Sequence, residues 1–284
     1  MLSFALCSPK SCSRFLADSG WHKINKQKTP HNVGAVKSIT AENDEDREAV
    51  RHRDARGITG RLLWVAATRP DIAWATANLA RNAHDPGAAW WTAAKRIAAY
   101  LKGTMEAALI YEPSDNEAVV LRAQVDADHA GCPDTSRSTT GAVYTVNGTA
   151  VHWTSKRQTT AMKSSTDAEM FGAAAATSEI MWLQDILQSL GCTQRSPTEL
   201  NSDNSGVVIN SNTATNRRSK HMNVKFAIVR DAKYQRKIRV VKCKSSENIA
   251  NGLTKPVGPT GIAKLKRAVN LWHTTRAKYS NDGF

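Results

Sequence analysis

Three acidic residues stand at the edges of separate predicted elements. Asp126 ends an apolar, alternating run over residues 119–125. Glu169 falls near the start of a long helical stretch, and Asp203 ends a short strand-like run. Hard cations such as Mg²⁺ take oxygen ligands, carboxylates among them. An isolated pair such as Asp126 and Asp128 more often only forms the turn after a strand. Three acids at three element ends favour a divalent-cation site over three unrelated turns.

Glu169 also has a purely structural interpretation. Thr166 and Glu169 have the spacing of a capping box, in which the Glu side chain bonds back to the first amide of the helix. On spacing alone, the helix cap is the better interpretation of Glu169. Asp128 is expected in the loop after the strand, and its closeness to Asp126 makes it a reserve candidate for the site.

The pattern of apolar residues predicts an α/β domain in the second half of the chain. Alternation predicts strands, and a period of 3.6 residues predicts helices. Asn147-Gly148 is typical of a hairpin turn that needs positive φ, and Gly191 is expected to end the long helix. Three antiparallel strands, followed by helix–strand crossovers, make a mixed sheet flanked by helices. The expected strands cover residues 119–126, 139–147, 150–156, 198–203 and 237–243, and the expected helices cover residues 165–190, 204–211, 220–235 and 260–271.

Residues 57–103 have a helical pattern throughout. Arg69-Pro70-Asp71 interrupts it and starts the next helix, with Pro near the first helical position. Large aromatic side chains in such a block are more often core residues than base-stacking residues. We therefore expect burial of Trp64, Trp74, Trp90 and Trp91.

The net charge of +14 is concentrated towards the C-terminal end. From Arg217 onward there are 17 Lys or Arg and three acids, whereas the first 216 residues contain 22 of each. Nucleic acid is the natural partner of such a stretch, because neutralising phosphates releases counterions and supplies affinity that does not depend on sequence. The alternative is a solvated basic surface without a specific partner.

The overall composition allows one or two domains. The chain has 284 residues, of which 41% are apolar, which is enough for a core. No apolar run approaches the roughly 20 residues of a transmembrane helix, and the first residues lack the basic start of a secretory signal. The five cysteines are scattered and odd in number, which fits free thiols in a reducing compartment. We therefore expect an intracellular protein, cytoplasmic or nuclear and not secreted, without a membrane partner.

Seven short motifs occur in a fixed order in the second half of the chain. They are Asp126-Ala-Asp-His-Ala-Gly-Cys132, Arg137-Ser-Thr-Thr-Gly141, Trp153-Thr-Ser-Lys156, Ser164-Ser-Thr-Asp-Ala-Glu169, Asp203-Asn204, Arg218-Ser-Lys-His221 and Leu253-Thr-Lys-Pro256. In this order they resemble the ribonuclease H domain of copia-type LTR retrotransposon Pol polyproteins. Residues 59–104 resemble the segment that joins reverse transcriptase to ribonuclease H, and residues 15–30 more faintly resemble the end of a polymerase thumb.

The resemblance implies a ribonuclease H-like fold and hydrolysis of the RNA strand of RNA-DNA hybrids. It assigns Asp126, Glu169 and Asp203 to the catalytic, metal-binding set, and so changes our interpretation of Glu169 from cap to ligand. Two Mg²⁺ about 3.5–4 Å apart would activate water and stabilise the leaving oxygen, and Mn²⁺ is expected to substitute. Contacts to the 2′-OH would select RNA. The expected partners are an RNA-DNA hybrid or other nucleic acid and, in a full-length Pol, the reverse transcriptase domain.

The chain departs from the family at the fourth acid. The family typically has Ala-Asp shortly before Thr-Lys-Pro, whereas this chain has Asn251 at that position. Asn251 can offer a carbonyl oxygen as the fourth member of the site, but it brings no negative charge, so a second Mg²⁺ should be held more weakly. His129 and Met170 also replace usual residues, and His221 is interpreted as structural.

Three functional interpretations remain open from the sequence. The first is a ribonuclease H-type enzyme, weakened or lost if Asn251 cannot replace the fourth acid. The second is a nonenzymatic nucleic-acid-binding remnant of the same fold. The third is a helical interaction protein in which the acids only form turns.

The expected organisation has four parts. Residues 1–56 form a poorly ordered leader, and residues 57–113 form a helical connection segment. Residues 118–256 form the ribonuclease H-like domain, with its mixed five-stranded sheet flanked by helices. Residues 257–284 form a basic helical tail.

Overall fold

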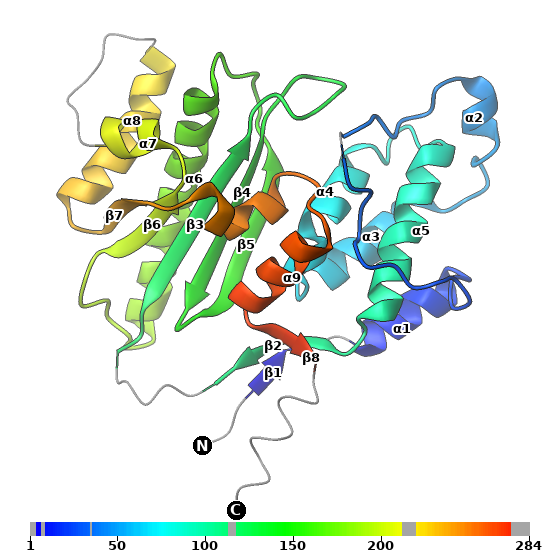
Figure 1. Ribbon diagram of the computed structural model, residues 1–284, viewed down its shortest axis with the longest axis horizontal. Coiled ribbons are helices and arrows are strands. Elements are labelled where there is room, and N and C mark those ends of the chain that lie inside the picture. The colour runs from blue at the N-terminus through cyan, green and yellow to red at the C-terminus, as the bar shows by residue number, and fades with distance from the viewer. Residues whose placement is uncertain (1–3, 7–8, 35, 113–117, 212–219, 274–284) are drawn as a thin grey trace, which may run out of the picture. The chain divides into compact units, whose positions relative to one another are not determined.

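The computed structural model describes residues 4–6, 9–34, 36–112, 118–211 and 220–273 (Figure 1). The chain forms two compact units, of which the first combines residues 1–113 with residues 256–284 and the second consists of residues 114–255. Each unit has a hydrophobic core of its own. All three acids of the expected site belong to the second unit.

The first unit combines helices with a small antiparallel sheet. Its helices are α1 (Pro9–Asp18), α2 (Asp44–Glu48), α3 (Ala55–Ala66), the short 3₁₀ helix η1 (Pro70–Ile72), α4 (Ala73–Arg81), α5 (Ala88–Gly103) and α9 (Pro259–Ala268). Its sheet has the order β1-β2-β8, formed by β1 (Phe4–Leu6), β2 (Ala107–Tyr111) and β8 (Leu271–His273). The sequence did not predict these strands, because short strands whose partners lie far away in the chain leave little local pattern.

Tryptophan side chains contribute much of the core of the first unit. Trp90 is fully buried and donates its Nε1–H to the carbonyl of Leu79 at 2.9 Å. Two of the other predicted core tryptophans are buried as well. The prediction is wrong for Trp64, which is 70% exposed. Helix α3 buries Leu62 and Val65, and Trp64 falls on the opposite, solvent-facing side of the same helix.

Arg69 and Asp71 form a buried ion pair where α3 gives way to η1. The guanidinium donates to both carboxylate oxygens of Asp71, at 2.8 and 2.7 Å, and also to the carbonyl of Thr104. The hydroxyl of Tyr100 donates to the same carboxylate. Burial opposes the charged form of Asp71, but the Arg69 charge outweighs it and lowers the pKa of Asp71. The helix interruption predicted at Arg69-Pro70-Asp71 therefore contains a buried ion pair whose charges are hydrogen-bonded to each other.

The two ends of the chain both contribute to the core of the first unit. Phe15, from the stretch expected to be a poorly ordered leader, is buried in α1. Ile262 and Leu265 of α9 are also buried, and β8 pairs with β2. Burial lowers the pKa of Lys266, so this cation belongs to the packed structure. The described part of the expected basic tail, residues 257–273, is thus integral to the first unit.

The second unit is built on a mixed five-stranded sheet in the order β5-β4-β3-β6-β7. The strands are β3 (Leu121–Asp128), β4 (Thr139–Val146), β5 (Thr149–Arg157), β6 (Thr198–Ser202) and β7 (Ile238–Lys242). The first three pair antiparallel, whereas β6 pairs parallel to β3 and β7 pairs parallel to β6. Its helices are α6 (Ser165–Ser189), α7 (Ser205–Asn210), α8 (Lys220–Tyr234) and the 3₁₀ helices η2 (Ser245–Glu247) and η3 (Ile249–Leu253) (Figure 1). The predicted mixed α/β sheet is confirmed.

Turn residues end these elements as the sequence predicts. Asn147 and Gly148 have positive φ values of 49° and 87°, so the predicted hairpin turn between β4 and β5 is confirmed. Gly191 follows α6 with a φ of 78°, a conformation that glycine adopts without a steric penalty.

Helix α6 packs closely on the central strand β3 because it presents small side chains to the sheet. A Cβ added at Gly172 would lie 3.2 Å from Thr140 Cγ2 and 3.3 Å from Val125 Cγ2. Ala173 and Ala176 of the same helix are also buried in the core of the unit. The close approach fixes the start of α6 against the end of β3, where the acidic residues lie.

Truncation after Lys255 is expected to unfold the first unit while the second stays folded. The deletion removes α9 and β8 with the buried side chains of Ile262, Leu265 and Leu271, and full burial of each such side chain contributes about 1.5–3 kcal/mol. Amide hydrogen exchange should show lost protection in α4 and α5 and retained protection in β3 and α6. Truncation after His273, which keeps both elements, is the control. Unchanged protection of α5 in the shorter chain would contradict this assignment of the tail.

Candidate metal centre

Asp126 and Asp203 are brought to one level by the register of two parallel strands. In the pairing of β3 with β6, Arg122 lies opposite Glu199. Asp126 and Asp203 each follow this pair by four residues, so the same register places them at adjacent strand ends. Because side chains alternate along a strand, residues at equal offsets project towards the same face. The sheet itself therefore brings the two carboxylates together.

Glu169 reaches the same place from the first turns of α6. The N-cap of α6 is Ser164, whose Oγ accepts a hydrogen bond from the amide of Asp167 at 3.1 Å. Thr166 lies inside the helix, so the capping-box interpretation of Glu169 is wrong. The side chain of Glu169 is instead buried, and its Oε2 has no hydrogen-bond partner. A buried carboxylate oxygen without a donor suits a cation ligand, since leaving it unpaired is costly.

The three carboxylates converge. Asp126, Glu169 and Asp203 each offer an oxygen, and these oxygens all lie within 4.8 Å of one another. Within the described part of the chain, this is the one group of His, Cys, Asp and Glu side chains that could share a metal ion. Asp126 and Glu169 are buried and Asp203 is half-buried. Carboxylates this close repel one another in their charged forms, so the arrangement calls for a compensating positive charge.

Burial and the repulsion between neighbouring acids raise the pKa values of Asp126 and Glu169. Burial first, and then the negative charges of Asp126 and Asp203, raise the pKa of Glu169 to about 8. Burial also raises the pKa of Asp126, although the hydroxyl of Thr254 and the charge of Lys255 oppose the rise. Without a bound cation, Glu169 is therefore mostly protonated at neutral pH.

A segment that follows β7 supplies hydrogen-bond donors to these acids. Thr254 donates its hydroxyl to Asp126 Oδ2, and Lys255 Nζ lies 3.9 Å from the same oxygen. Asn248 donates its amide to Val125 O at 2.9 Å and to Asp203 Oδ1 at 3.3 Å. Sequence reasoning gave these side chains no role. The Leu253-Thr-Lys-Pro256 motif was the available signal for Thr254 and Lys255, whereas no pattern marked Asn248.

Gly141 allows this segment to approach the sheet. It lies opposite Asp126 in the pairing of β3 with β4. An added Cβ would lie 2.7 Å from Leu253 Cβ and 2.9 Å from the carbonyl oxygen of Ala250. A larger residue would push η3, and with it Thr254, away from Asp126. The glycine of the Arg137-Ser-Thr-Thr-Gly141 motif therefore has a packing reason.

Asn251 lies in the same segment, but its amide nitrogen is engaged elsewhere. It donates to the carbonyls of Ser245 at 3.0 Å and Asn248 at 2.8 Å. The backbone carbonyl of Asn251 accepts a hydrogen bond from the backbone N–H of Thr254 at 3.2 Å. In this arrangement Asn251 orders the turn that carries Thr254.

The sequence singled out three further residues, which are Asp128, His129 and His221. The carboxylate of Asp128 occupies the space beside Gly131, where an added Cβ would meet its Oδ2 at 1.8 Å. His129 Nε2 lies 3.1 Å from the carbonyl of Met162. His221 belongs to α8, but its side chain lies outside the described residues.

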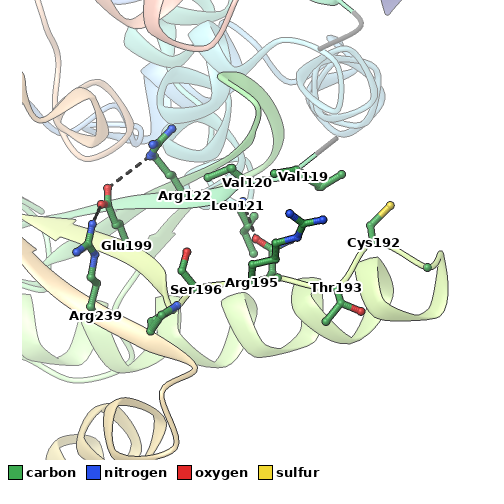
Figure 2. Close-up of a pocket in the computed structure, with 14 residues that line it drawn as sticks. Val119, Val120, Leu121, Arg122, Cys192, Thr193, Arg195, Ser196, Glu199 and Arg239 are labelled. Carbon is green, nitrogen blue, oxygen red and sulfur yellow. Dashed lines mark hydrogen bonds and ion pairs between the residues drawn. The ribbon is translucent and has the colours of Figure 1, made fainter. Parts of the chain in front are cut away.

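The second unit has a cavity at the other end of the sheet. Figure 2 shows this cavity of about 480 Å³, lined by the start of β3 and the loop between α6 and β6. Arg122 and Arg239 both pair with Glu199 at its edge. Gln194 Oε1 accepts the amide of Leu121 at 2.9 Å and so ties the loop to β3. The three converging carboxylates do not line this cavity, so the cavity does not mark the candidate metal site.

Sequence comparison finds relatives among transposon proteins. The chain is 35% identical over 213 residues to the retrovirus-related Pol polyprotein from transposon TNT 1-94 of Nicotiana tabacum, a match that covers 75% of this chain and 16% of that protein. It is 33% identical over 217 residues to the corresponding protein from transposon RE1 of Arabidopsis thaliana, covering 76% and 15%. The chain thus spans about a sixth of the length of these relatives. No family model matches it.

Among solved structures, the chain is similar to LC11-RNase H1, isolated from compost by a metagenomic approach. The identity is 18%, the match covers 48% of this chain and 92% of that one, and the TM-score is 0.38. No helix in the described ranges is long and apolar enough to span a membrane. The motif order and the transposon relatives agree. The chain belongs to the copia-type retrotransposon Pol polyproteins, and its second unit has the ribonuclease H-like fold.

Proposed function

We propose that the second unit is a ribonuclease H-type hydrolase that cleaves the RNA strand of RNA-DNA hybrids with the help of divalent metal ions. The observation that carries the proposal is the convergence of Asp126, Glu169 and Asp203 from three separate elements to within 4.8 Å. In a full-length Pol, its partner would be the reverse transcriptase domain, which makes such hybrids. Twelve of the 17 basic residues from Arg217 onward belong to the second unit and support its binding to a nucleic-acid backbone.

The residues of the centre fit a hard divalent cation such as Mg²⁺. They offer carboxylate oxygens only, the ligand type that Mg²⁺ takes, and Mn²⁺ suits the same ligands. Glu169 Oε2 is buried without a hydrogen-bond partner and is therefore available for an ion. When bound, the metal supplies a lowered pKa for an attacking water and charge neutralisation at the scissile phosphate.

The chain's own residues have distinct tasks in this proposal. Asp126, Glu169 and Asp203 hold the metal. The hydroxyl of Thr254 orients Asp126, and the amide of Asn248 orients Asp203. Such outer partners fix ligand direction and typically contribute about 10–100-fold in affinity or activity. Asn251, at the place of the fourth acid, could contribute a carbonyl oxygen but no charge.

A second candidate function is favoured by Asn251 alone. Its side chain is neutral, and its amide nitrogen is bonded to the carbonyls of Ser245 and Asn248. If the lost charge prevents productive metal binding, the unit would be a nonenzymatic module that binds nucleic acid with the same fold.

Without divalent ions, the second unit should lose stability as the pH rises from about 4.5 to about 8. Glu169 has a pKa of 4.5 in the unfolded chain and about 8 in the folded one. The folded state therefore binds more protons across this window, and its stability decreases as the pH rises. Mg²⁺ should restore the melting temperature at pH 8 and change it little at pH 5. The measurement is calorimetry with chelator or with Mg²⁺.

Glu169→Gln is the matched variant for this experiment. It keeps the size of the side chain and removes the titration, so its melting temperature should vary less with pH and respond less to Mg²⁺. Parallel curves for the wild type and Glu169→Gln would show that Glu169 is neither perturbed nor part of a cation site.

Hybrid cleavage should fall in two substituted proteins and rise in a third. Asp126→Asn should reduce Mg²⁺-dependent cleavage of a labelled RNA-DNA hybrid by more than about 100-fold, beyond the effect typical of outer partners. Thr254→Val, which only removes the donor to Asp126, should reduce it by about 10–100-fold. Asn251→Asp should raise cleavage and lower the Mg²⁺ concentration required, because an added carboxylate binds a hard cation better.

The wild type distinguishes the two candidate functions. Metal-dependent cleavage that disappears in Asp126→Asn supports the enzyme. Cleavage by Asn251→Asp alone would mark a remnant disabled at one position. If the wild type and Asn251→Asp both bind the hybrid and neither cleaves it, the nonenzymatic module is established and the hydrolase is refuted.

A further inference from the structure

Among the described residues, the side-chain donors that reach the carboxylate group come from one segment. Thr254 and Lys255 both approach Asp126 Oδ2, and Asn248 approaches Asp203 Oδ1. These three side chains belong to the segment that follows β7. Glu169 comes from α6, on a different element, and its Oε2 receives no hydrogen bond. The site is therefore asymmetric, because side-chain donors lie beside Asp126 whereas one carboxylate oxygen of Glu169 accepts no hydrogen bond.

Lys255 is the one of these donors that carries a full charge. Its Nζ lies 3.9 Å from Asp126 Oδ2, and its side chain is 42% exposed, whereas that of Asp126 is 4% exposed. An ion pair with one buried partner is less screened by solvent than a pair on the surface. Lys255 is thus a resident cation beside the buried acid of the centre.

The charges of the group then balance with one divalent ion. Three carboxylates within 4.8 Å carry three negative charges when ionised, and Lys255 offsets one of them. Asp128 is not one of the three converging acids, and its carboxylate lies beside Gly131, although its charge interacts with those of Asp126 and Lys255. Asn251 adds no charge, and its amide nitrogen is bonded to backbone carbonyls. Two negative charges remain on the three converging carboxylates, which matches a single Mg²⁺ or Mn²⁺.

We propose that this centre binds one divalent ion, and that Lys255 provides the second positive charge beside Asp126. The inference rests on the proposed function and specifies its metal requirement. It differs from the two-ion expectation that the resemblance alone implies. Lys255 acts on the metal through Asp126, so it sets the charge of the site and is not itself assigned to the reacting atoms.

The proposal is tested by titrating the 284-residue chain with Mn²⁺ alone. The electron paramagnetic resonance signal of the free ion reports how much Mn²⁺ is bound. The wild type should bind one Mn²⁺ per chain. Lys255→Met should bind this ion about five-fold more tightly, the factor that corresponds in water to the interaction of unit charges about 4 Å apart, the separation of Lys255 Nζ from Asp126 Oδ2. Lys255→Arg should restore the wild-type Kd, since it keeps the charge.

Lys244→Met is the matched control. Lys244 is 81% exposed and pairs with Glu247, so removing it changes the net charge equally without touching Asp126. Its Kd for Mn²⁺ should stay at the wild-type value. Circular dichroism should show that all variants fold, because the half-exposed Lys255 fills no core position.

The outcomes separate this inference from the proposed function. Two equivalent Mn²⁺ per wild-type chain, or an unchanged Kd in Lys255→Met, would overturn the inference and leave the hydrolase proposal standing. A similar tightening in Lys244→Met would also overturn it, because the effect would then reflect net charge. A wild type that binds no Mn²⁺ would overturn both.

Discussion

The second unit depends on holding like charges together at the end of its sheet. The parallel register of β3 and β6 places Asp126 and Asp203 at the same level, and the close packing of Gly172 brings the start of α6 to the same point. Each of these contacts is stabilised by apolar packing and backbone pairing that would be the same without any acid. The sheet thus holds the carboxylates together against their mutual repulsion, and burial, followed by this repulsion, raises the pKa of Glu169. A preorganised group of this kind needs little rearrangement to accept a cation.

The segment after β7 places hydrogen-bond donors beside the acids that repel one another. Asn248 links the acidic ends of two strands, since its amide reaches both Val125 O and Asp203 Oδ1. Thr254 and Lys255 then meet Asp126. The segment can come this close only because Gly141 has no side chain to displace Leu253. The motif that ends at Gly141 and the Leu253-Thr-Lys-Pro256 motif are far apart in the chain. Together they position a hydroxyl donor and a positive charge beside the buried carboxylate of Asp126.

The first unit shows a different use of buried charge. Arg69 and Asp71 satisfy each other completely, with Tyr100 and Thr104 completing their hydrogen bonds. In this pair the opposite charge outweighs burial and lowers the pKa of Asp71, whereas in the second unit burial and the neighbouring acids together raise the pKa of Glu169. A satisfied ion pair holds a structural joint, and an unsatisfied set of acids is available to a ligand.

The sequence by itself determined the elements of the second unit and the identity of its three acids, because alternation, helical period and turn residues such as Asn147-Gly148 are local signals. The motif order was enough to select Glu169, although spacing alone favoured a helix cap. Only the tertiary structure decided that Ser164 is the cap, that Trp64 faces solvent, and that residues 257–273 complete the first unit through α9 and β8. It also revealed Asn248 and the charge of Lys255 beside Asp126. The contacts at Asp126 and Asp203 join residues more than 40 positions apart, and no local pattern encodes which distant side chain will occupy the space beside a buried carboxylate.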